Sequence, residues 1–179
     1  MTEEANKIVA ELEGLADRRS IVLYNEDWHK GVIGIVASRL TEIYYRPAVV
    51  LTRTDDMATG SARSVSGFDV YKAIEHCRDL LENFGGHTYA AGLSMKVENV
   101  QAFTERFESF VSEHILPEQT SAVIDIDAEI DFKDITPKFF NELKRFNPFG
   151  PDNQKPVFCT HHVYDYGTSK VVGLSLIHI

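Results

Sequence analysis

Residues 21–65 decide the fold of this chain, and they read IVLYNEDWHKGVIGIVASRLTEIYYRPAVVLTRTDDMATGSARSV. The stretch opens with a short apolar run at 21–24, which predicts a buried strand. After a polar loop, residues 32–45 carry apolar side chains at helical spacing until Pro47 ends the pattern. A strand followed by a helix that leads into further strands indicates an α/β domain, in which helices pack on a layered sheet.

The flanking segments continue this alternation. Residues 48–52 and 59–65 predict two more strands, and Asp69 is placed to cap a helix whose apolar positions run to Leu81. Residues 83–87, NFGGH, are expected to break that helix. The remaining elements predicted here are helices over 3–18 and 99–115 and a strand over 93–97. We therefore predict an α/β fold with a layered sheet and flanking helices.

The character of the chain changes after Pro117. Residues 122–132 alternate apolar and acidic side chains, which predicts a half-buried strand. Thr136 and Pro137 have the residue types of a helix start, with Thr as the N-cap. A turn-rich stretch then leads into strand-like text at 157–166 and 170–173. This second part is predicted to begin a small β-rich domain.

The net charge and its distribution along the chain point in different directions on nucleic-acid binding. The net charge is −9, which on its own argues against nucleic-acid binding. However, residues 97–134 contain ten acidic and two basic side chains (−8), whereas residues 26–96 contain nine and eight (−1). The stretch with the most distinctive motifs is nearly neutral, so a local phosphate site there stays possible.

Two classes of protein are disfavoured by composition. No apolar run approaches the ~20 residues that span a bilayer, so a membrane partner is not expected. The N-terminus is acidic and lacks an apolar signal core, and the two cysteines, Cys77 and Cys159, form no C-x-x-C motif. A cytoplasmic, reducing setting is the expectation.

Two clusters have the chemistry of phosphate binding. Residues 28–34, WHKGVIG, place two glycines at a helix start, where free N–H groups favour an anion. Ser61 and Arg63 alternate on one strand face and would offer a hydroxyl beside a guanidinium. The alternatives are a tight turn for the first cluster and an edge strand with a solvated arginine for the second.

Two further clusters are rich in glycine. Gly85 and Gly86 can form a backbone N–H concavity for a phosphate, and His87 could donate to a phosphate oxygen or act near a scissile bond. The alternative is a helix C-cap followed by a tightly packed small-residue segment. Residues 146–153, FNPFGPDN, are predicted to be a linker with turn chemistry.

A metal site is not predicted. Four acidic residues alternate along 125–131, but acids on one strand face are more often solvated than bound to a metal. His161 and His162 are neighbours on a predicted strand, so they point to opposite faces. The sequence contains no Asp-His-His triplet, H-E-x-x-H motif or Walker A loop.

Taken in order, these clusters resemble the RecJ family of the Asp-His-His phosphoesterase superfamily. The matching text is WHKGVIGIVASRL, RPAVVL, GSARS, GFD, FGGH, AAG and PFGPDNQKPVF, between about Val22 and Gly173. The glycine-glycine-histidine motif alone also suits the superfamily's oligonucleotide and cyclic-dinucleotide phosphodiesterases and the editing-type domain of alanyl-tRNA synthetases. PFGPDNQKPVF, with a β domain after it, favours RecJ.

The resemblance implies a two-part active site. An N-terminal catalytic domain, missing from this sequence, would hold a pair of Mn²⁺ or Mg²⁺ ions, and no cofactor is expected in this chain itself. Residues 21–117, after a linker helix at 1–20, would form the Asp-His-His-associated domain that faces the catalytic domain and grips single-stranded DNA. Residues 118–179 would form a partial OB-like domain that guides the strand.

The family's site residues carry over onto this sequence one by one. By this resemblance, Ser61 and Arg63 fall where the family holds a strand phosphate, with the 5′ end as a candidate. His87, with Gly85 and Gly86, falls on the motif that approaches the substrate near the metals, and His87 is the candidate catalytic residue. The further candidates at the groove are Arg39, Trp28 and His29.

The implied parent is a metal-dependent 5′-to-3′ exonuclease that degrades single-stranded DNA in repair and recombination. This chain alone is expected to be inactive because it lacks the metal site. The alternatives are another superfamily phosphodiesterase and a non-catalytic nucleic-acid-binding module. The sequence departs from the family after residues 171–173, where LSLIHI replaces the expected charged strand, so the OB-like domain is predicted to be truncated.

Overall fold

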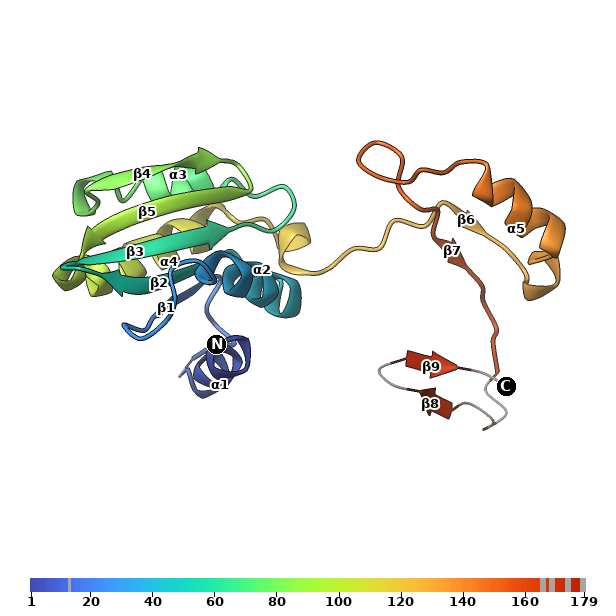
Figure 1. Ribbon diagram of the computed structural model, residues 1–179, viewed down its shortest axis with the longest axis horizontal. Helices are drawn as coiled ribbons and strands as arrows, with labels where there is room; N and C mark the ends of the chain where they lie inside the picture. The colour runs from blue at the N-terminus through green and yellow to red at the C-terminus, as the bar shows by residue number, and fades with distance from the viewer. Residues whose placement is uncertain (13, 165–166, 168–169, 173–174, 178–179) are drawn as a thin grey trace. The chain divides into compact units, whose positions relative to one another are not determined.

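The computed structural model describes residues 1–179 apart from 13, 165–166, 168–169, 173–174 and 178–179 (Figure 1). It divides into two compact units, Met1–Ala122 and Val123–Ile179. The sequence predicted a domain boundary at 117–118 and a separate helix at 1–20, whereas residues 1–20 lie inside the first unit. Each unit is described by itself.

The first unit is built on one five-stranded sheet in the order β1-β2-β3-β5-β4. Only β1 and β2 are parallel, and the other neighbours are antiparallel. A parallel pair needs a crossover, and the helix predicted at 32–45 provides it. The strands are β1 (Ile21–Tyr24), β2 (Ala48–Thr54), β3 (Met57–Arg63), β4 (Asn83–His87) and β5 (Ala90–Lys96).

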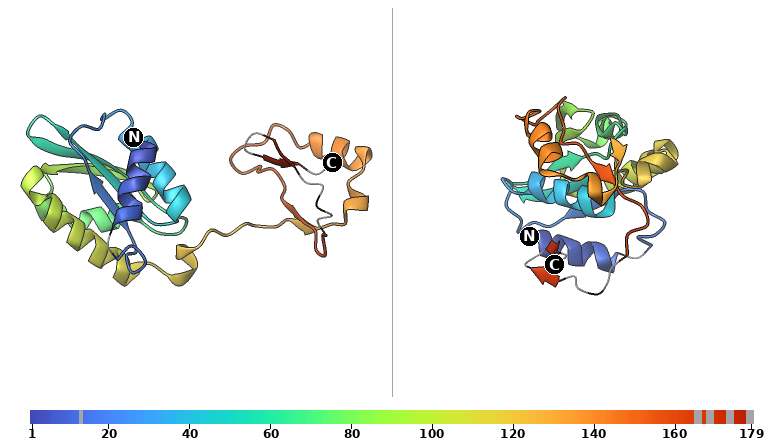
Figure 2. Two further views of the ribbon diagram at one scale, coloured as in Figure 1. Left: turned by 90° about the horizontal axis from the view of Figure 1, so that it is seen from below. Right: turned by 90° about the vertical axis from the view of Figure 1, so that its right-hand side faces the viewer.

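Helices cover the two faces of this sheet unequally. On one face α1 (Thr2–Glu11) and α2 (Ile33–Tyr44) bury Ile21, Ala48 and Val50 in a core over β1 and β2. On the other face α3 (Val70–Glu75) and α4 (Val100–His114) form the larger core. Figure 1 shows α2 in front of the sheet and α4 behind it, and the view from below in Figure 2 has the two helices on opposite sides of the sheet. The α/β prediction, a sheet with flanking helices, is confirmed.

Two predicted helices are shorter in the structure. The helix expected over 3–18 ends at Glu11, and Ala5 and Val9 are the residues that it buries. The helix expected to reach Leu81 ends at Glu75, and a 3₁₀ turn, Arg78–Leu80, follows it. Its predicted cap is confirmed, because the Asp69 side chain accepts a hydrogen bond from the Lys72 N–H. In both segments the apolar pattern continues beyond the last helical residue, because the side chains that follow the helix also pack on the core.

The segment expected only to break a helix is in fact strand β4. Residues 83–87 pair along their whole length with β5. Two glycines make this segment a poor strand by composition. The ladder with β5 overrides that weak local preference, because each backbone group that pairs gains a partner.

The second unit contains short elements and no buried residue among those described. The strand predicted over 122–132 is wrong for most of its length: only β6 (Ala128–Glu129) pairs, with β7 (Phe158–Cys159). The alternation of apolar and acidic residues would give a strand one apolar face, but it does not supply a strand to pair with. Ile124 is accordingly 72% exposed. The remaining elements of the first unit are the 3₁₀ turns Val97–Asn99 and Pro117–Thr120. Those of the second unit are the 3₁₀ turn Phe132–Asp134, α5 (Pro137–Lys144), β8 (Lys170–Val172) and β9 (Ser175–Ile177).

Two predictions about this unit have clear outcomes. The Thr136 hydroxyl accepts from the Phe139 N–H at 3.2 Å, so the predicted cap of α5 is confirmed. The strand predicted over 157–166 is limited to β7 in the described part, and residues 165–166 and 173–174 lie outside it. Among the helices that the structure describes, none is long and apolar enough to cross a bilayer.

The two cysteines should differ sharply in reactivity. Cys77 is fully buried, and burial raises the pKa of its thiol to about 11, whereas Cys159 is half-buried. At pH 8 about one Cys77 thiol in a thousand would be ionised, and the thiolate is the nucleophile. We expect iodoacetamide to label Cys159 well before Cys77 in the native protein, as peptide mass spectrometry would report. Equal labelling rates without denaturant would contradict this assignment.

Candidate nucleic-acid interface

The strand register gathers predicted site residues at one end of the sheet. Arg63 of β3 lies opposite Ala90 of β5, and Ala90 lies opposite His87 of β4. Paired residues project to the same face of a sheet, and so do residues two apart on one strand. Ser61 therefore shares this face with Arg63 and His87. It is the same face that α2 covers over β2 and β3.

The Arg63 guanidinium is held in place by its own strand. Its Nη1 donates to Ser61 Oγ and to the Ala62 carbonyl oxygen, each at 2.8 Å. The first turn of α2 lies directly above, because a Cβ added to Gly34 would lie 3.0 Å from Arg63 Nη2 and 3.2 Å from Ser61 Oγ. A guanidinium, a hydroxyl and a helix N-terminus all favour negative charge. Their meeting here suits a phosphate.

His87 presents one ring nitrogen outward. Its side chain is exposed, and its Nδ1 accepts a hydrogen bond from the Tyr89 N–H at 3.3 Å. When Nδ1 of a neutral imidazole accepts, the proton is carried on Nε2. His87 can therefore offer an Nε2–H donor to a phosphate oxygen. The Tyr89 ring, 58% exposed, meets the imidazole edge-on with 6.3 Å between ring centroids.

The two glycines of β4 have different roles. Gly86 has φ +156°, and a Cβ there would overlap the Ala90 carbonyl oxygen and lie 2.5 Å from Ala91 Cα. Glycine at this position is therefore needed for β4 to pair with β5. At Gly85 a Cβ would meet no atom within 4 Å. Gly85 leaves open space above the sheet, on the face that carries Arg63.

Trp28 was predicted at the groove, and the structure corrects this. Trp28 is only 4% exposed, its Nε1 donates to Glu4 Oε2 at 3.0 Å, and its carbonyl oxygen accepts from the Thr52 hydroxyl. It anchors the loop before α2 to α1 and β2, and its ring is not available to a ligand. His29 is exposed, and its Nδ1 accepts from the Gly31 N–H, which shapes the same loop.

Arg39, also predicted at the groove, lies elsewhere on α2. At 3.6 residues per turn it lies about 140° around α2 from Gly34, the residue that faces Arg63. It is exposed and paired with Glu42 at 2.7 Å. Its part in the groove stays a prediction.

Sequence reasoning missed a groove that continues from this site. The groove is about 400 Å³ in volume, and its lining includes both Gly85 and Gly92. The other lining residues are Lys30, Thr59, Asn83, Phe84, Leu93 and Ser94. Lys30 stood in the WHKGVIG motif, and Thr59 is two residues before Ser61 on β3. The sequence shows that Thr59 and Ser61 are two residues apart on one strand. It does not show which strands lie beside that strand, so the groove could not be predicted.

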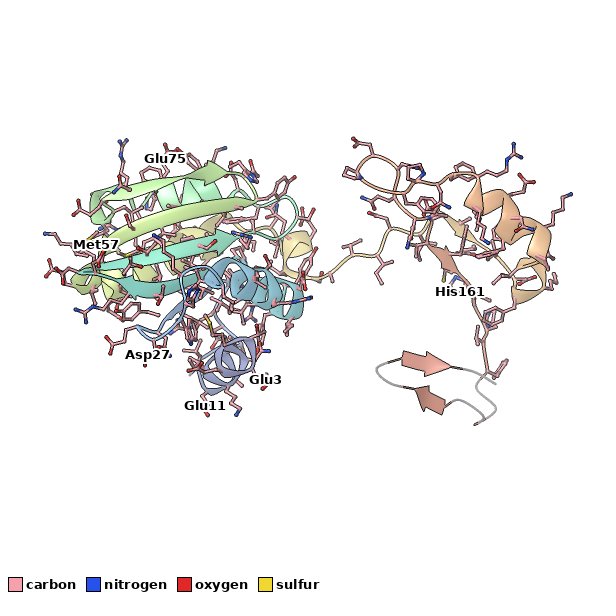
Figure 3. The ribbon with its side chains drawn as sticks, in the orientation of Figure 1. Glu3, Glu11, Asp27, Met57, Glu75 and His161 are labelled. Atoms are coloured by element: carbon pink, nitrogen blue, oxygen red, sulfur yellow. The ribbon has the colours of Figure 1, made fainter. Side chains whose placement is uncertain are left out.

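The second unit brings acidic, histidine and cysteine side chains close to one another. Glu129 pairs with His161 at 3.2 Å, His161 Nε2 lies 3.8 Å from Cys159 Sγ, and Asp127 accepts from the Val157 N–H (His161 is labelled in Figure 3). No group of three metal-binding side chains that could hold an ion occurs among the described residues. The resemblance places the Mn²⁺ or Mg²⁺ pair in the N-terminal catalytic domain and not among these residues.

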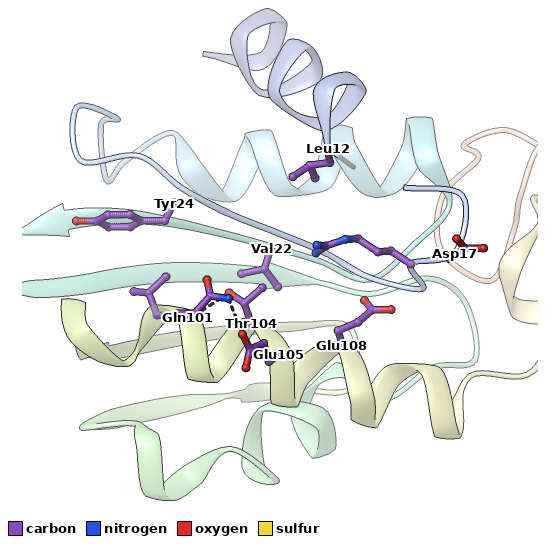
Figure 4. A pocket seen from close by; sticks show the side chains of 10 residues that line it. Leu12, Asp17, Val22, Tyr24, Gln101, Thr104, Glu105 and Glu108 are labelled. Carbon is purple, nitrogen blue, oxygen red and sulfur yellow. Dashed lines mark hydrogen bonds between the residues drawn. The ribbon is translucent and has the colours of Figure 1, made fainter. Parts of the chain in front are cut away.

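A cavity of about 700 Å³ lies on the opposite face, between β1 and α4 (Figure 4). Val22 and Tyr24 of β1 form part of its wall, and on α4 Gln101 Nε2 donates to Glu105 Oε1 at 2.6 Å. Its lining includes three carboxylates and one arginine. Because carboxylates repel a phosphate, this cavity does not compete with the site at Arg63.

Comparison with known proteins matches both units. Residues 17–113 match the DHHA1 domain family, and residues 126–178 match the RecJ OB domain family. The single-stranded-DNA-specific exonuclease RecJ of Bacillus subtilis is 39% identical over 158 residues, which are 87% of this chain and 20% of that protein. RecJ of Thermus thermophilus is 32% identical over 142 residues, 79% of this chain and 20% of the relative.

The structural comparison agrees. The crystal structure of Thermus thermophilus RecJ in complex with Mg²⁺ superposes with a TM-score of 0.75 at 28% identity, covering 87% of this chain and 24% of that one. This chain thus spans about a fifth of the length of these two relatives. With a DHHA1 match covering residues 17–113 and a RecJ OB match after it, the chain belongs to the DHHA1 domain family and corresponds to the C-terminal part of RecJ.

Proposed function

We propose that this chain grips single-stranded DNA for a RecJ-type exonuclease, with a strand phosphate held by Ser61 and Arg63 and with His87 beside it. The observation that carries the proposal is the register that places these three side chains on one face of the sheet. The relatives' activity on single-stranded DNA supports the choice of ligand.

Each side chain has a definite part in this proposal. The fork of Arg63 binds two phosphate oxygens, and the Ser61 hydroxyl, which already accepts from Arg63, donates its own proton to a third. His87 donates from Nε2 and offsets negative charge on the neighbouring phosphate. All three hold and position the strand, and none of them activates a nucleophile.

Hydrolysis itself is assigned to the rest of a longer RecJ-type protein. Its Asp-His-His domain would supply two Mn²⁺ or Mg²⁺ ions, which activate water and stabilise the attacking and leaving oxygens. We propose digestion in the 5′-to-3′ direction, a role in DNA repair and recombination, and a cytoplasmic location. Without that domain, the present chain is expected to bind DNA and not to cleave it.

Arg63→Ala tests the proposal directly. Binding of a 5′-phosphorylated, fluorescently labelled single strand, measured by anisotropy at low salt, is expected to weaken about tenfold, because a hydrogen bond to a charged group contributes roughly 1.5–3 kcal/mol. Arg53→Ala is the matched control, since Arg53 also lies on a strand but is paired with Glu26 at 3.4 Å. Addition of Mn²⁺ to the wild-type samples should leave the DNA intact.

The assignment fails if folded Arg63→Ala protein binds the strand as tightly as wild type. It also fails if both arginine variants weaken binding equally, because that result would indicate nonspecific attraction to positive charge. Melting curves of each variant would establish that the protein is folded before binding is compared.

A further inference from the structure

The face of the sheet that carries Arg63 is only partly covered. Helix α2 packs on β2 and β3, whereas no helix that the structure describes covers β5 and β4 on this side (Figure 1). The groove of about 400 Å³ described above lies over this uncovered part. It adjoins the phosphate site because Ser61 and Gly85 both lie opposite Gly92.

The floor of this groove is low and polar. A Cβ at Gly85 would meet nothing within 4 Å, and one at Gly92 would meet only a backbone oxygen at 4.0 Å. Beside the glycines, Ser94 lies opposite both Thr59 and Asn83, so two hydroxyls and an amide form one row. These three groups can donate hydrogen bonds to an anion, and the glycines allow a backbone to approach closely.

The charge of the groove identifies its occupant. Lys30 is its only charged lining residue among those described, and none of the lining residues is a carboxylate, although the chain carries a net charge of −9. Lys30 is exposed and lies in the loop before α2. A lysine above neutral donors and without carboxylates suits a phosphodiester backbone better than an apolar or basic protein surface.

We propose that this groove holds the next stretch of the single strand whose phosphate is bound at Ser61 and Arg63, with Lys30 as a second phosphate contact. The inference depends on the proposed function and extends it. Lys30 lines the groove together with Thr59. Thr59 lies about 13 Å along β3 from Arg63, at roughly 3.3 Å per residue. That separation requires a phosphate other than the one held by Arg63, so Lys30 acts only on ligands longer than one nucleotide.

Lys30→Ala should therefore weaken binding in a length-dependent way. For a 5′-phosphorylated oligothymidylate of several nucleotides, we expect affinity to fall about threefold and the slope of log K against log salt to drop by about 0.7, the value for one contact on a single strand. Competition by thymidine 5′-monophosphate, which has one phosphate, should not change. Lys72→Ala, on the opposite face with its side chain 71% exposed, is the matched control.

A second variant tests whether the open space of the groove is needed for binding, and it leaves the charge of the groove unchanged. Gly85→Val places a branched side chain on the groove floor without meeting another atom at its Cβ, and β-branched residues suit strands. It should weaken oligonucleotide binding while the salt slope stays at the wild-type value. If Lys30→Ala keeps the wild-type slope, or if Gly85→Val leaves affinity unchanged, the groove does not carry the strand.

The Arg63 variant separates the two proposals. If Arg63→Ala weakens both oligonucleotide and mononucleotide binding while Lys30→Ala changes neither, the phosphate site stands and the groove inference falls. If Arg63→Ala changes neither ligand, the proposed function itself is wrong.

Discussion

Glu108→Ala is expected to lower the free energy of unfolding of the first unit by about 3 kcal/mol. The Glu108 carboxylate of α4 accepts hydrogen bonds from the Arg19 N–H at 2.7 Å, the Ser20 N–H at 2.9 Å and the Ser20 hydroxyl at 2.5 Å. Ser20 is 2% exposed, so its groups cannot turn to water when the carboxylate is removed. Each buried donor left without a partner costs roughly 1–3 kcal/mol.

Through these hydrogen bonds, Glu108 of α4 also holds the segment directly before β1 against α4. Its three partners lie 88 or 89 residues away in sequence, and Figure 4 shows its side chain between α4 and that segment. The only tryptophan of the chain, Trp28, is buried in this unit and reports its unfolding by fluorescence in urea. Glu113→Ala is the matched control, since Glu113 is exposed and, within the described part of the chain, accepts from the Ser109 hydroxyl. Equal urea midpoints for the two variants would show that Glu108 is not an anchor.

Gly86→Ala is the second substitution for which we expect a large effect, about 2–3 kcal/mol. The added Cβ would overlap the Ala90 carbonyl oxygen and crowd Ala91 Cα, and both are backbone atoms of the paired strand. Forcing extra atoms into a packed site costs about 1–3 kcal/mol, and the φ of +156° adds strain for a residue with a side chain. Relief would require β4 to separate from β5, which would also displace His87.

Gly85→Ala is the control that makes this prediction sharp. It makes the same chemical change one residue earlier on β4, where the Cβ meets nothing within 4 Å, so stability should stay within about 0.5 kcal/mol. Amide hydrogen exchange should speed up in β4 and β5 for Gly86→Ala only. If the two variants exchange and unfold alike, the close approach at Gly86 is not what selects glycine.

Local signals in the sequence were sufficient for the longer elements. The apolar spacing of α2 and α4 extends over three or more turns, and Asp69 and Thr136 have side chains that cap the next N–H groups. These signals depend on residues within four positions of one another, so no knowledge of the partner strands was needed. Strand β4 lacked such a signal, because two of its five residues are glycine.

The candidate site also combines features that local sequence predicts with features that depend on the tertiary structure. The sequence by itself determined the chemical types, a hydroxyl and a guanidinium two residues apart at Ser61 and Arg63 and a histidine after two glycines. Only the tertiary structure decided that His87 lies in the same row as Arg63, that Lys30 borders the groove, and that Trp28 is buried. Strand order and register join residues far apart in sequence, and the burial that selects them depends on the packing of the whole sheet, which no local pattern encodes.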